Sequence, residues 1–322
     1  MNKPFVFCLI VALVFGAAAA GAQERSERIG IMGPPEEPRF SDIRNGLQQG
    51  LRDQGYTEQA LEILEARVTR HDLEGVRAAV EGLLQQQVTV LVVIGSRLAR
   101  LARQVSAELP IVYLTPGDPL RHGLAASLAR PGGNTTAMTF EYPELAGKRL
   151  QLLQEILPRA RRFLILYDPR GGASAQGAAA AREAAPQLGL TLVEREVRSR
   201  EDLARGLEAL AEVDALLAIP GGEPTGHYAE IIQGANAKRV LTIFHGWTNS
   251  TMEALVSYGA RDVAIAQQVA RHVAKILQGV KAGELPVERP MRLELVINLT
   301  IARQIGVTIP SEVLLQAHRV VE

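Results

Sequence analysis

The chain has 322 residues, and its 35 lysine and arginine residues are balanced by 35 aspartate and glutamate residues, so its formal net charge is zero. This balance argues against a nucleic-acid-binding surface, which needs a basic excess. A hydrophobic content of 47% with only 4% aromatic residues is typical of an α/β protein, and a chain of this length usually divides into two domains.

The N-terminus has the layout of a secretory signal peptide. Lys3 precedes an apolar run from Phe5 to Phe15, and small residues follow up to an Ala-Gly-Ala cleavage sequence that ends at Ala22. The alternative is an uncleaved membrane anchor, but this run is shorter than the roughly 20 residues that span a bilayer. We therefore expect residues 1–22 to be removed and the mature protein to reach the periplasm. Cys8, the one cysteine, lies in this segment, so the mature chain would have no disulfide and no thiol chemistry.

Apolar runs and helical patterns alternate through the first half of the mature chain. The runs predict strands at 28–32, 61–68, 88–94 and 110–115, and the patterns between them predict helices at 40–51, 73–87 and 96–107. This alternation predicts βαβ units and a parallel sheet. Turn-rich clusters at 115–119 and 130–134 then suit a crossing between domains.

The same alternation restarts in the second half. Helices are predicted at 143–157, 174–188, 200–211 and 228–236, and strands at 162–167, 190–197, 215–219, 240–244 and 254–258. A long amphipathic helix that ends at Gly279 and a strand at 292–299 follow. The fold class is therefore α/β, with two doubly wound parallel-sheet lobes. Such lobes bind ligands at the carboxyl ends of their strands, so the expected site is a cleft between them.

Catalytic signatures are missing from the sequence. It has no G-x-S-x-G, no H-E-x-x-H, no phosphate-binding G-x-x-x-x-G-K-[ST], and no G-x-G-x-x-G after the first strand. The six histidines are scattered without the spacing of metal ligands. We expect neither an enzyme nor a bound metal or cofactor.

The first half offers candidate ligand contacts where its strands end. Gly33 ends the first strand and would shape the pocket wall. Ser96 and Arg97 lie where a buried strand meets a helix, and free N–H groups at a helix start favour an anion such as a carboxylate. Ser96 equally suits a plain helix cap. Asp118 either accepts a hydrogen bond from a ligand amine or braces its proline-rich turn.

The remaining candidates lie in the first crossing and in the second half. Thr139 and Phe140 fall in the first crossing, and Asp168, Gly221 and Glu223 follow strands of the opposite wall. Trp247, in a loop after a strand, would stack on a ligand or pack over its own loop. The hydroxyl of Tyr258 would reach the cleft or tie the hinge.

Several stretches resemble one known family in content and order. They are SLARPGGN at 127–134, ELAGKRL at 144–150, VSYG at 256–259, KILQG at 275–279, ELPVERP at 284–290 and ELVINL at 294–299. Together they resemble the ABC transporter substrate-binding proteins that include tryptophan- and tyrosine-type binding components, over nearly all of the mature chain. The chain departs from the family pattern at Glu253-Ala254 and at 245–250, which leaves the ligand's identity open.

The resemblance implies a type I periplasmic binding fold with three hinge crossings and no catalysis. It implies an N-terminal lobe of residues 27–138 plus 261–290 and a C-terminal lobe of 139–260 plus 291–322. The positions that match cleft-facing segments are Gly95-Ser96, Asp118, Thr139 and Tyr258. The implied role is a monomer that captures an amino acid or related organic acid and delivers it to an ABC permease in the inner membrane. A receptor for a membrane sensor and, more remotely, an α/β hydrolase remain alternatives.

Overall fold

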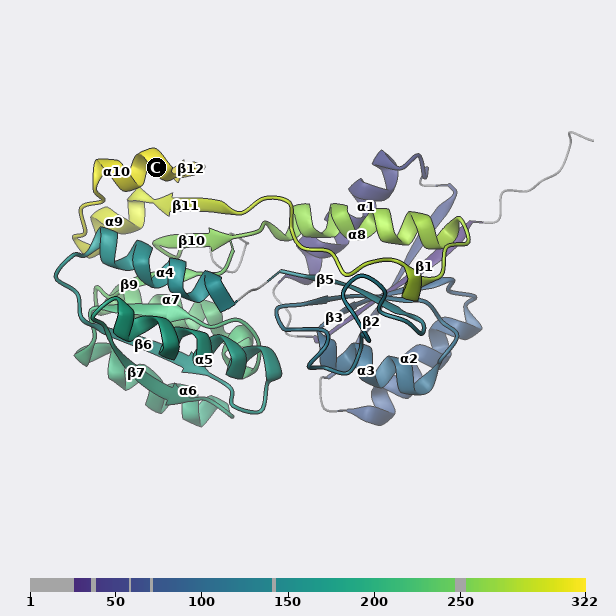
Figure 1. The fold of residues 1–322 in the computed structure, drawn as a ribbon, viewed down its shortest axis with the longest axis horizontal. Helices are drawn as coiled ribbons and strands as arrows, with labels where there is room; N and C mark the ends of the chain where they lie inside the picture. Colours follow the sequence, from purple (N-terminus) through teal and green to yellow (C-terminus); the bar gives the residue numbers. More distant parts are fainter. Residues whose placement is uncertain (1–25, 36–38, 58, 70–71, 141–142, 247–252) are drawn as a thin grey trace, which may run out of the picture.

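The computed structural model describes residues 26–35, 39–57, 59–69, 72–140, 143–246 and 253–322, and they form two α/β lobes lying side by side (Figure 1). The predicted signal peptide and Trp247 lie outside the described residues. Within the described ranges, no helix combines the length and the apolar character that crossing a membrane requires.

The first lobe is built on a parallel sheet. Its strands are β1 (Glu27–Gly33), β2 (Leu61–Arg67), β3 (Val90–Ile94), β4 (Ile111–Thr115) and β5 (Thr135–Thr139), and they pair in the order β2-β1-β3-β4-β5. Helices α1 (Phe40–Asp53) and α8 (Asp262–Leu277) pack on one face, and α2 (Leu73–Gln85) and α3 (Ser96–Val105) pack on the other. Because both faces are covered, β3 and β4 are buried along their whole length, which explains their unbroken apolar runs.

The second lobe repeats this plan and extends it. Its strands are β6 (Arg162–Tyr167), β7 (Thr191–Glu196), β8 (Ala215–Ala218), β9 (Leu241–Phe244), β10 (Val256–Gly259), β11 (Glu294–Asn298) and β12 (Arg319–Val321). They pair in the order β12-β11-β10-β9-β8-β6-β7, so the part from β7 to β10 has the same winding as the first sheet. Each sheet therefore reverses its strand order once, between β1 and β3 and between β6 and β8.

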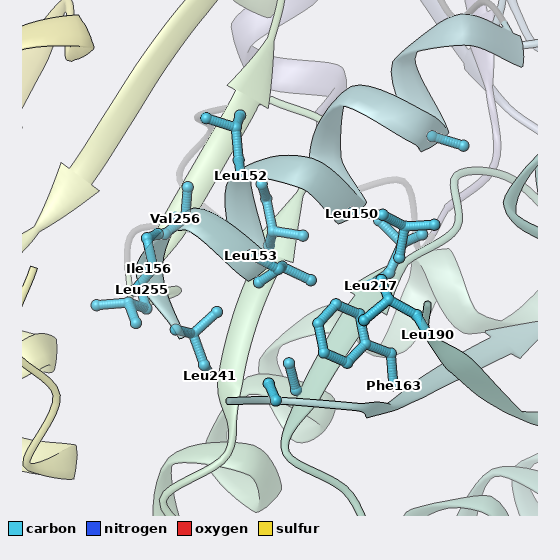
Figure 2. Packing of buried hydrophobic residues seen from close by; sticks show 14 of the residues in the cluster. Leu150, Leu152, Leu153, Ile156, Phe163, Leu190, Leu217, Leu241, Leu255 and Val256 are labelled. Carbon is cyan, nitrogen blue, oxygen red and sulfur yellow. The ribbon is translucent and has the colours of Figure 1, made fainter. Parts of the chain in front are cut away.

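Helices cover both faces of the second sheet as well. α4 (Pro143–Ile156), α5 (Gly172–Gln187), α9 (Leu299–Ile305) and α10 (Ser311–Gln316) contribute to the core on one face, and α6 (Arg200–Glu208) and α7 (Tyr228–Ala237) contribute to the core on the other. Figure 2 shows Leu153 and Ile156 of α4 packing toward Leu241 of β9 and Leu255 just before β10, with Phe163 of β6 beside Leu217 in the same cluster. Fully burying one such leucine stabilises the fold by about 1.5–3 kcal/mol.

Within the described residues the chain passes between the lobes at three places. It does so between β5 and α4, between β10 and α8, and between Met291, whose N–H donates to Gln268 of α8, and the start of β11 (Figure 1). The predicted class of two α/β lobes is confirmed. One detail differs, because β10 and β11 pair antiparallel. β10 ends at the crossing and β11 begins there, so two neighbouring strands that share this edge must run in opposite directions.

Local sequence signals set several helix ends. The Asp72 Oδ1 accepts a hydrogen bond of 2.8 Å from the Gly75 N–H at the start of α2, and Asn298 caps α9 in the same way through the Ile301 N–H at 3.0 Å. α9 stops at Gly306, whose φ of 77° places it in the left-handed region.

The packing of α8 on α1 joins a late helix to the first lobe. At Gly46, an added Cβ would lie 2.5 Å from the Val263 carbonyl oxygen, and at Gly50 it would lie 2.7 Å from the Ala270 Cβ. Glycine at these two positions lets the helix backbones approach closely. α8 follows β6 to β10 of the second lobe in sequence, yet its buried apolar residues belong to the core of the first lobe.

The sequence patterns missed some elements. The turn clusters at 115–119 and 130–134 were expected to mark a domain crossing, but they flank the connection between β4 and β5 within the first lobe, so that prediction was wrong. β5 is a threonine-rich strand without an aliphatic run, and its hydroxyls bond to carbonyls, as Thr135 does to Leu124 O at 2.7 Å. The short elements α9, α10 and β12 were also not predicted.

Candidate functional site

A cavity of about 460 Å³ lies between the two lobes. It is bordered by the loops that follow β3 in the first lobe and β6 and β8 in the second, and by Arg39 at the start of α1. These loops meet where each sheet reverses its strand order, which is the ligand site of open α/β sheets. The volume is within the range of small-molecule sites.

The first-lobe wall contains the start of α3. Gly95, with a φ of 108°, is the N-cap residue, and it has no side chain with which to cap the helix. Ser96 is therefore the first helical residue and not the cap, and both residues line the cavity. The N–H groups of the first turn point out of the helix end with partial positive charge, which suits an anionic group.

The second-lobe wall is organised by the buried carboxylate of Asp168. Its Oδ1 accepts hydrogen bonds from the Arg170 N–H and Nε, both at 2.9 Å, and its Oδ2 accepts from Arg170 Nη2 at 3.0 Å and from the Glu223 N–H at 3.3 Å. Burial acts to raise the pKa of Asp168, but these hydrogen bonds and the Arg170 charge outweigh it, so the pKa falls below its usual value. Asp168 thus fastens the loop after β6 to the loop after β8.

Gly222 is required beside that carboxylate. Its φ is 72°, and an added Cβ would collide with the Asp168 Cβ. Gly221, with a φ of 89°, and Gly222 both line the cavity, so the loop after β8 presents backbone to a ligand here.

Arg39, Phe140 and His245 form a third part of the lining, next to the crossings. The Arg39 guanidinium lies 4.3 Å from the Phe140 ring centroid, and its Nε donates to Asp262 Oδ1 at 2.7 Å. Both members of this ion pair are buried. Asp262 begins α8 directly after one crossing, and Phe140 begins another, so Arg39 touches both connections and the cavity.

His245 is buried beside this group. Its Nε2 lies 3.1 Å from the Tyr228 hydroxyl, and its ring centroid lies 6.4 Å from that of Phe140. Burial, with the nearby charges of Arg39 and Arg149, holds the pKa of His245 well below its usual value. The imidazole is therefore neutral at pH 7.

The lobes also touch through the loop between β4 and β5. The Asp118 N–H donates to the Gln176 Oε1 at 3.3 Å, and an added Cβ on Gly172 would lie 3.0 Å from the His122 Nε2. Burial lowers the pKa of His122. Each of these contacts links the loop to the first turns of α5.

The predicted site residues divide into those that line the cavity and those that do not. Those that line it are Ser96, Arg97, Phe140, Asp168, Gly221 and Glu223. Asp118 and Thr139 line a neighbouring hollow of about 380 Å³. Asp118 braces its turn by accepting from the Leu120 N–H at 2.9 Å, and the Thr139 hydroxyl donates to Gly117 O at 3.0 Å.

Gly33 and Tyr258 line neither space. At Gly33, an added Cβ would lie 3.0 Å from the Phe40 ring, so this glycine makes room for α1. The Tyr258 carbonyl accepts from Arg149 Nε at 2.9 Å, which fixes the strand before the second crossing.

Four prominent cavity residues were missed by sequence reasoning: Arg39, His122, Arg170 and His245. His245 directly follows β9 and Arg170 follows β6 by three positions, so the rule that ligands bind at carboxyl strand ends covers them. Arg39 has no such local signal, because its place depends on the ion pair with Asp262, 223 residues away.

Residues 28–321 match the family model described as ABC transporter substrate binding protein. The chain belongs to this family. The family consists of solute-binding proteins and not of enzymes, so the hydrolase alternative is excluded. Among the described residues, no group of three or more histidine, cysteine, aspartate or glutamate side chains is placed to hold a metal ion.

Several known proteins are similar to this substrate-binding protein. A tyrosine-binding protein of Clostridioides difficile is 20% identical over 276 residues, which are 85% of this chain and 79% of the relative. The crystal structure of a conserved domain protein from Vibrio cholerae has a TM-score of 0.82 at 26% identity, covering 92% of this chain and all of that one. An ABC domain from Streptococcus pneumonia in complex with L-Trp has a TM-score of 0.79 at 22% identity, covering 91% of this chain and all of that one. These structures share the type I periplasmic binding fold with this chain.

Proposed function

We propose that this protein is the exported solute-binding component of an ABC importer. It captures a small solute, an amino acid or a related organic acid, in the cavity between its lobes and delivers it to an ABC permease in the inner membrane. The cavity carries this proposal, because it is formed by the ligand-binding ends of both sheets at once.

Binding of the solute would favour closure of the lobes through contacts near the three chain crossings, which act as the hinge. A ligand favours the closed form only through contacts that the open form lacks. Phe140 and Arg39 line the cavity, while Phe140 and Asp262, the ion-pair partner of Arg39, lie at two of the crossings. A solute that packs against them therefore contacts the segments that must rotate. The rotating bodies would be residues 27–138 plus 261–290 and residues 139–260 plus 291–322.

The solute class follows from the lining and from the relatives. Relatives bind tyrosine or L-Trp, as their names state. Here the first turn of α3 with Ser96 would hold a carboxylate, and Phe140 would cover an apolar part. Asp168 is already saturated by Arg170 and by the Glu223 N–H, so Glu223 is the better partner for an ammonium group.

Export and assembly complete the proposal. Substrate-binding proteins of ABC transporters normally work outside the cytoplasmic membrane, and the N-terminal sequence has the layout of a signal peptide. A monomer in the periplasm that docks to the permease in its closed form fits this role.

Calorimetry and thermal unfolding test the proposal directly. The purified mature protein is screened against amino acids and small organic acids. A solute at 100 times its dissociation constant raises the stability by roughly 2.7 kcal/mol. Ser96→Ala is expected to weaken that binding. Ser311→Ala is the matched control, because Ser311 also begins a helix without a capping bond but is not in the cavity lining. If no solute shifts the unfolding, or if both variants behave alike, the proposed site is wrong.

A further inference from the structure

The charged side chains that line the cavity are unequal in sign. The cationic ones are Arg39, Arg97, Arg100, Arg121 and Arg170, and the anionic ones are Asp168 and Glu223. His122 and His245 also line it, but the pKa of each is lowered by burial, so both are neutral at pH 7. The protein as a whole has no net charge, so this local excess is a property of the cavity.

Part of the positive charge is already paired. Asp262 binds Arg39, and Asp168 binds Arg170. Arg121 lies 3.9 Å from the Asp118 carboxylate, a long and exposed contact. Glu223 in turn lies 3.3 Å from the Nε2 of His227. These ion pairs therefore leave the cavity with an excess of positive charge.

Arg97 and Arg100 supply the unpaired charge. Both side chains are exposed, and neither side chain makes a hydrogen bond or an ion pair with a described residue. They lie three positions apart on α3, so they are neighbours on its surface. Two adjacent guanidinium groups repel each other, and an anion between them relieves this repulsion while satisfying their donors.

The N-termini of α3 and α5 also contribute positive charge to the cavity. Gly95 to Arg97 at the start of α3 and Gly171 to Ala173 at the start of α5 face it from opposite lobes. Neither helix has an acidic residue in its first turn or a side-chain capping bond. Both ends therefore add partial positive charge to a cavity that already carries an arginine excess.

We infer that the solute is an anion, with more carboxylate or phosphate groups than ammonium groups. This inference rests on the proposed function and narrows it from amino acids and organic acids in general to net negatively charged ones. One anionic group would bind at the start of α3 with Arg97 and Arg100. A second would bind at the start of α5. Bridging the two positive walls, such a solute stabilises the closed form more than a neutral one does.

Matched solute pairs test this by calorimetry on the mature protein. The pairs are L-glutamate and L-glutamine, succinate and succinamide, and glycerol 3-phosphate and glycerol, with L-tyrosine and L-tryptophan as neutral references. The charged member of at least one pair is expected to bind at least about tenfold more tightly, because charge-assisted hydrogen bonds outweigh neutral ones. Its affinity should fall as NaCl is raised. The first two pairs report carboxylates, and the third reports phosphate.

Variants then assign the effect to the cavity. Arg97→Gln and Arg100→Gln are each expected to weaken the anion's binding by about threefold to tenfold. Arg159→Gln is the control, because Arg159 is exposed just before β6, at the end of the sheet away from the cavity. Equal loss in the control overturns the inference. So does tight binding of neutral amino acids with no preference for anions, which leaves the proposed function intact. Failure of every solute to bind overturns both.

Discussion

Replacing Gly46 by alanine is expected to destabilise the first lobe, although alanine is the better helix former. Gly46 lies in α1 and faces α8. The new Cβ would lie 2.5 Å from the Val263 carbonyl oxygen and 2.8 Å from the Ala266 Cβ. The clash involves helix backbone, so α1 and α8 must move apart.

The magnitude follows from two opposing terms. Overpacking a tight interface costs about 1–3 kcal/mol, and the higher helix propensity of alanine returns up to about 1 kcal/mol. Because the clash involves the Val263 backbone, the overpacking cost is in the upper part of its range, about 2–3 kcal/mol, and the expected net loss is about 1–2 kcal/mol. This corresponds to a fall in Tm of roughly 2–8 °C for a unit of this size. Gly82→Ala in α2 is the matched control, because nothing lies within 4 Å of its added Cβ. It should gain up to about 1 kcal/mol.

Thermal and urea unfolding followed by circular dichroism measure the difference. Gly46→Ala should unfold earlier than the unmodified protein and Gly82→Ala later. α8 comes after most of the second lobe in the chain. A lower stability of Gly46→Ala would therefore show that this late helix packs into the core of the first lobe. If the two alanine variants gain stability equally, the close contact between α1 and α8 does not exist.

Three further results are expected. Asp262→Ala should cost about 3–5 kcal/mol in urea unfolding, because it breaks the buried ion pair between Asp262 and Arg39; a loss below 1 kcal/mol would contradict this. The lowered pKa of His245 means that the unfolded chain binds a proton below about pH 6.5 while the folded chain does not, so stability falls as pH falls. His245→Gln should flatten this dependence by up to about 1.4 kcal/mol per pH unit as the pH falls below about 6.5, measured by calorimetry, and an unchanged slope would refute it. Leu153→Ala should cost about 2–5 kcal/mol, whereas Leu315→Ala, at an 87% exposed residue, should stay within about 0.5 kcal/mol; similar losses would contradict the assigned burial.

The long regular elements could be predicted from the sequence because their burial repeats with the period of the structure. The run before Gly95 is apolar throughout because β3 is covered on both faces. β5 was not predicted because three of its five residues are threonines, so it has no apolar run. Its buried threonine hydroxyls donate to carbonyls of distant segments, such as Leu124 O and Leu285 O. Sequence patterns carry no record of those distant partners.

The site was predictable to the extent that it follows strand ends. Ser96, Asp168 and Gly221 come directly after or near the end of a strand, and the cavity brings them together. Arg39 escaped because a remote carboxylate and the Phe140 ring decide its position. Tyr258 was predicted to face the cleft or tie the hinge because it lies near the end of a strand, but it does not line the cavity. Which strand ends face the cavity depends on how the two lobes are arranged, which a local pattern does not encode.

Small-angle X-ray scattering with and without solute tests the central account most directly. The mature protein is measured alone and at a solute concentration that calorimetry shows to be saturating. Two lobes that share one cavity and three crossings should give a smaller radius of gyration and a shorter maximum dimension when the solute is bound. Identical scattering curves at proven saturation would contradict capture by closure between the lobes.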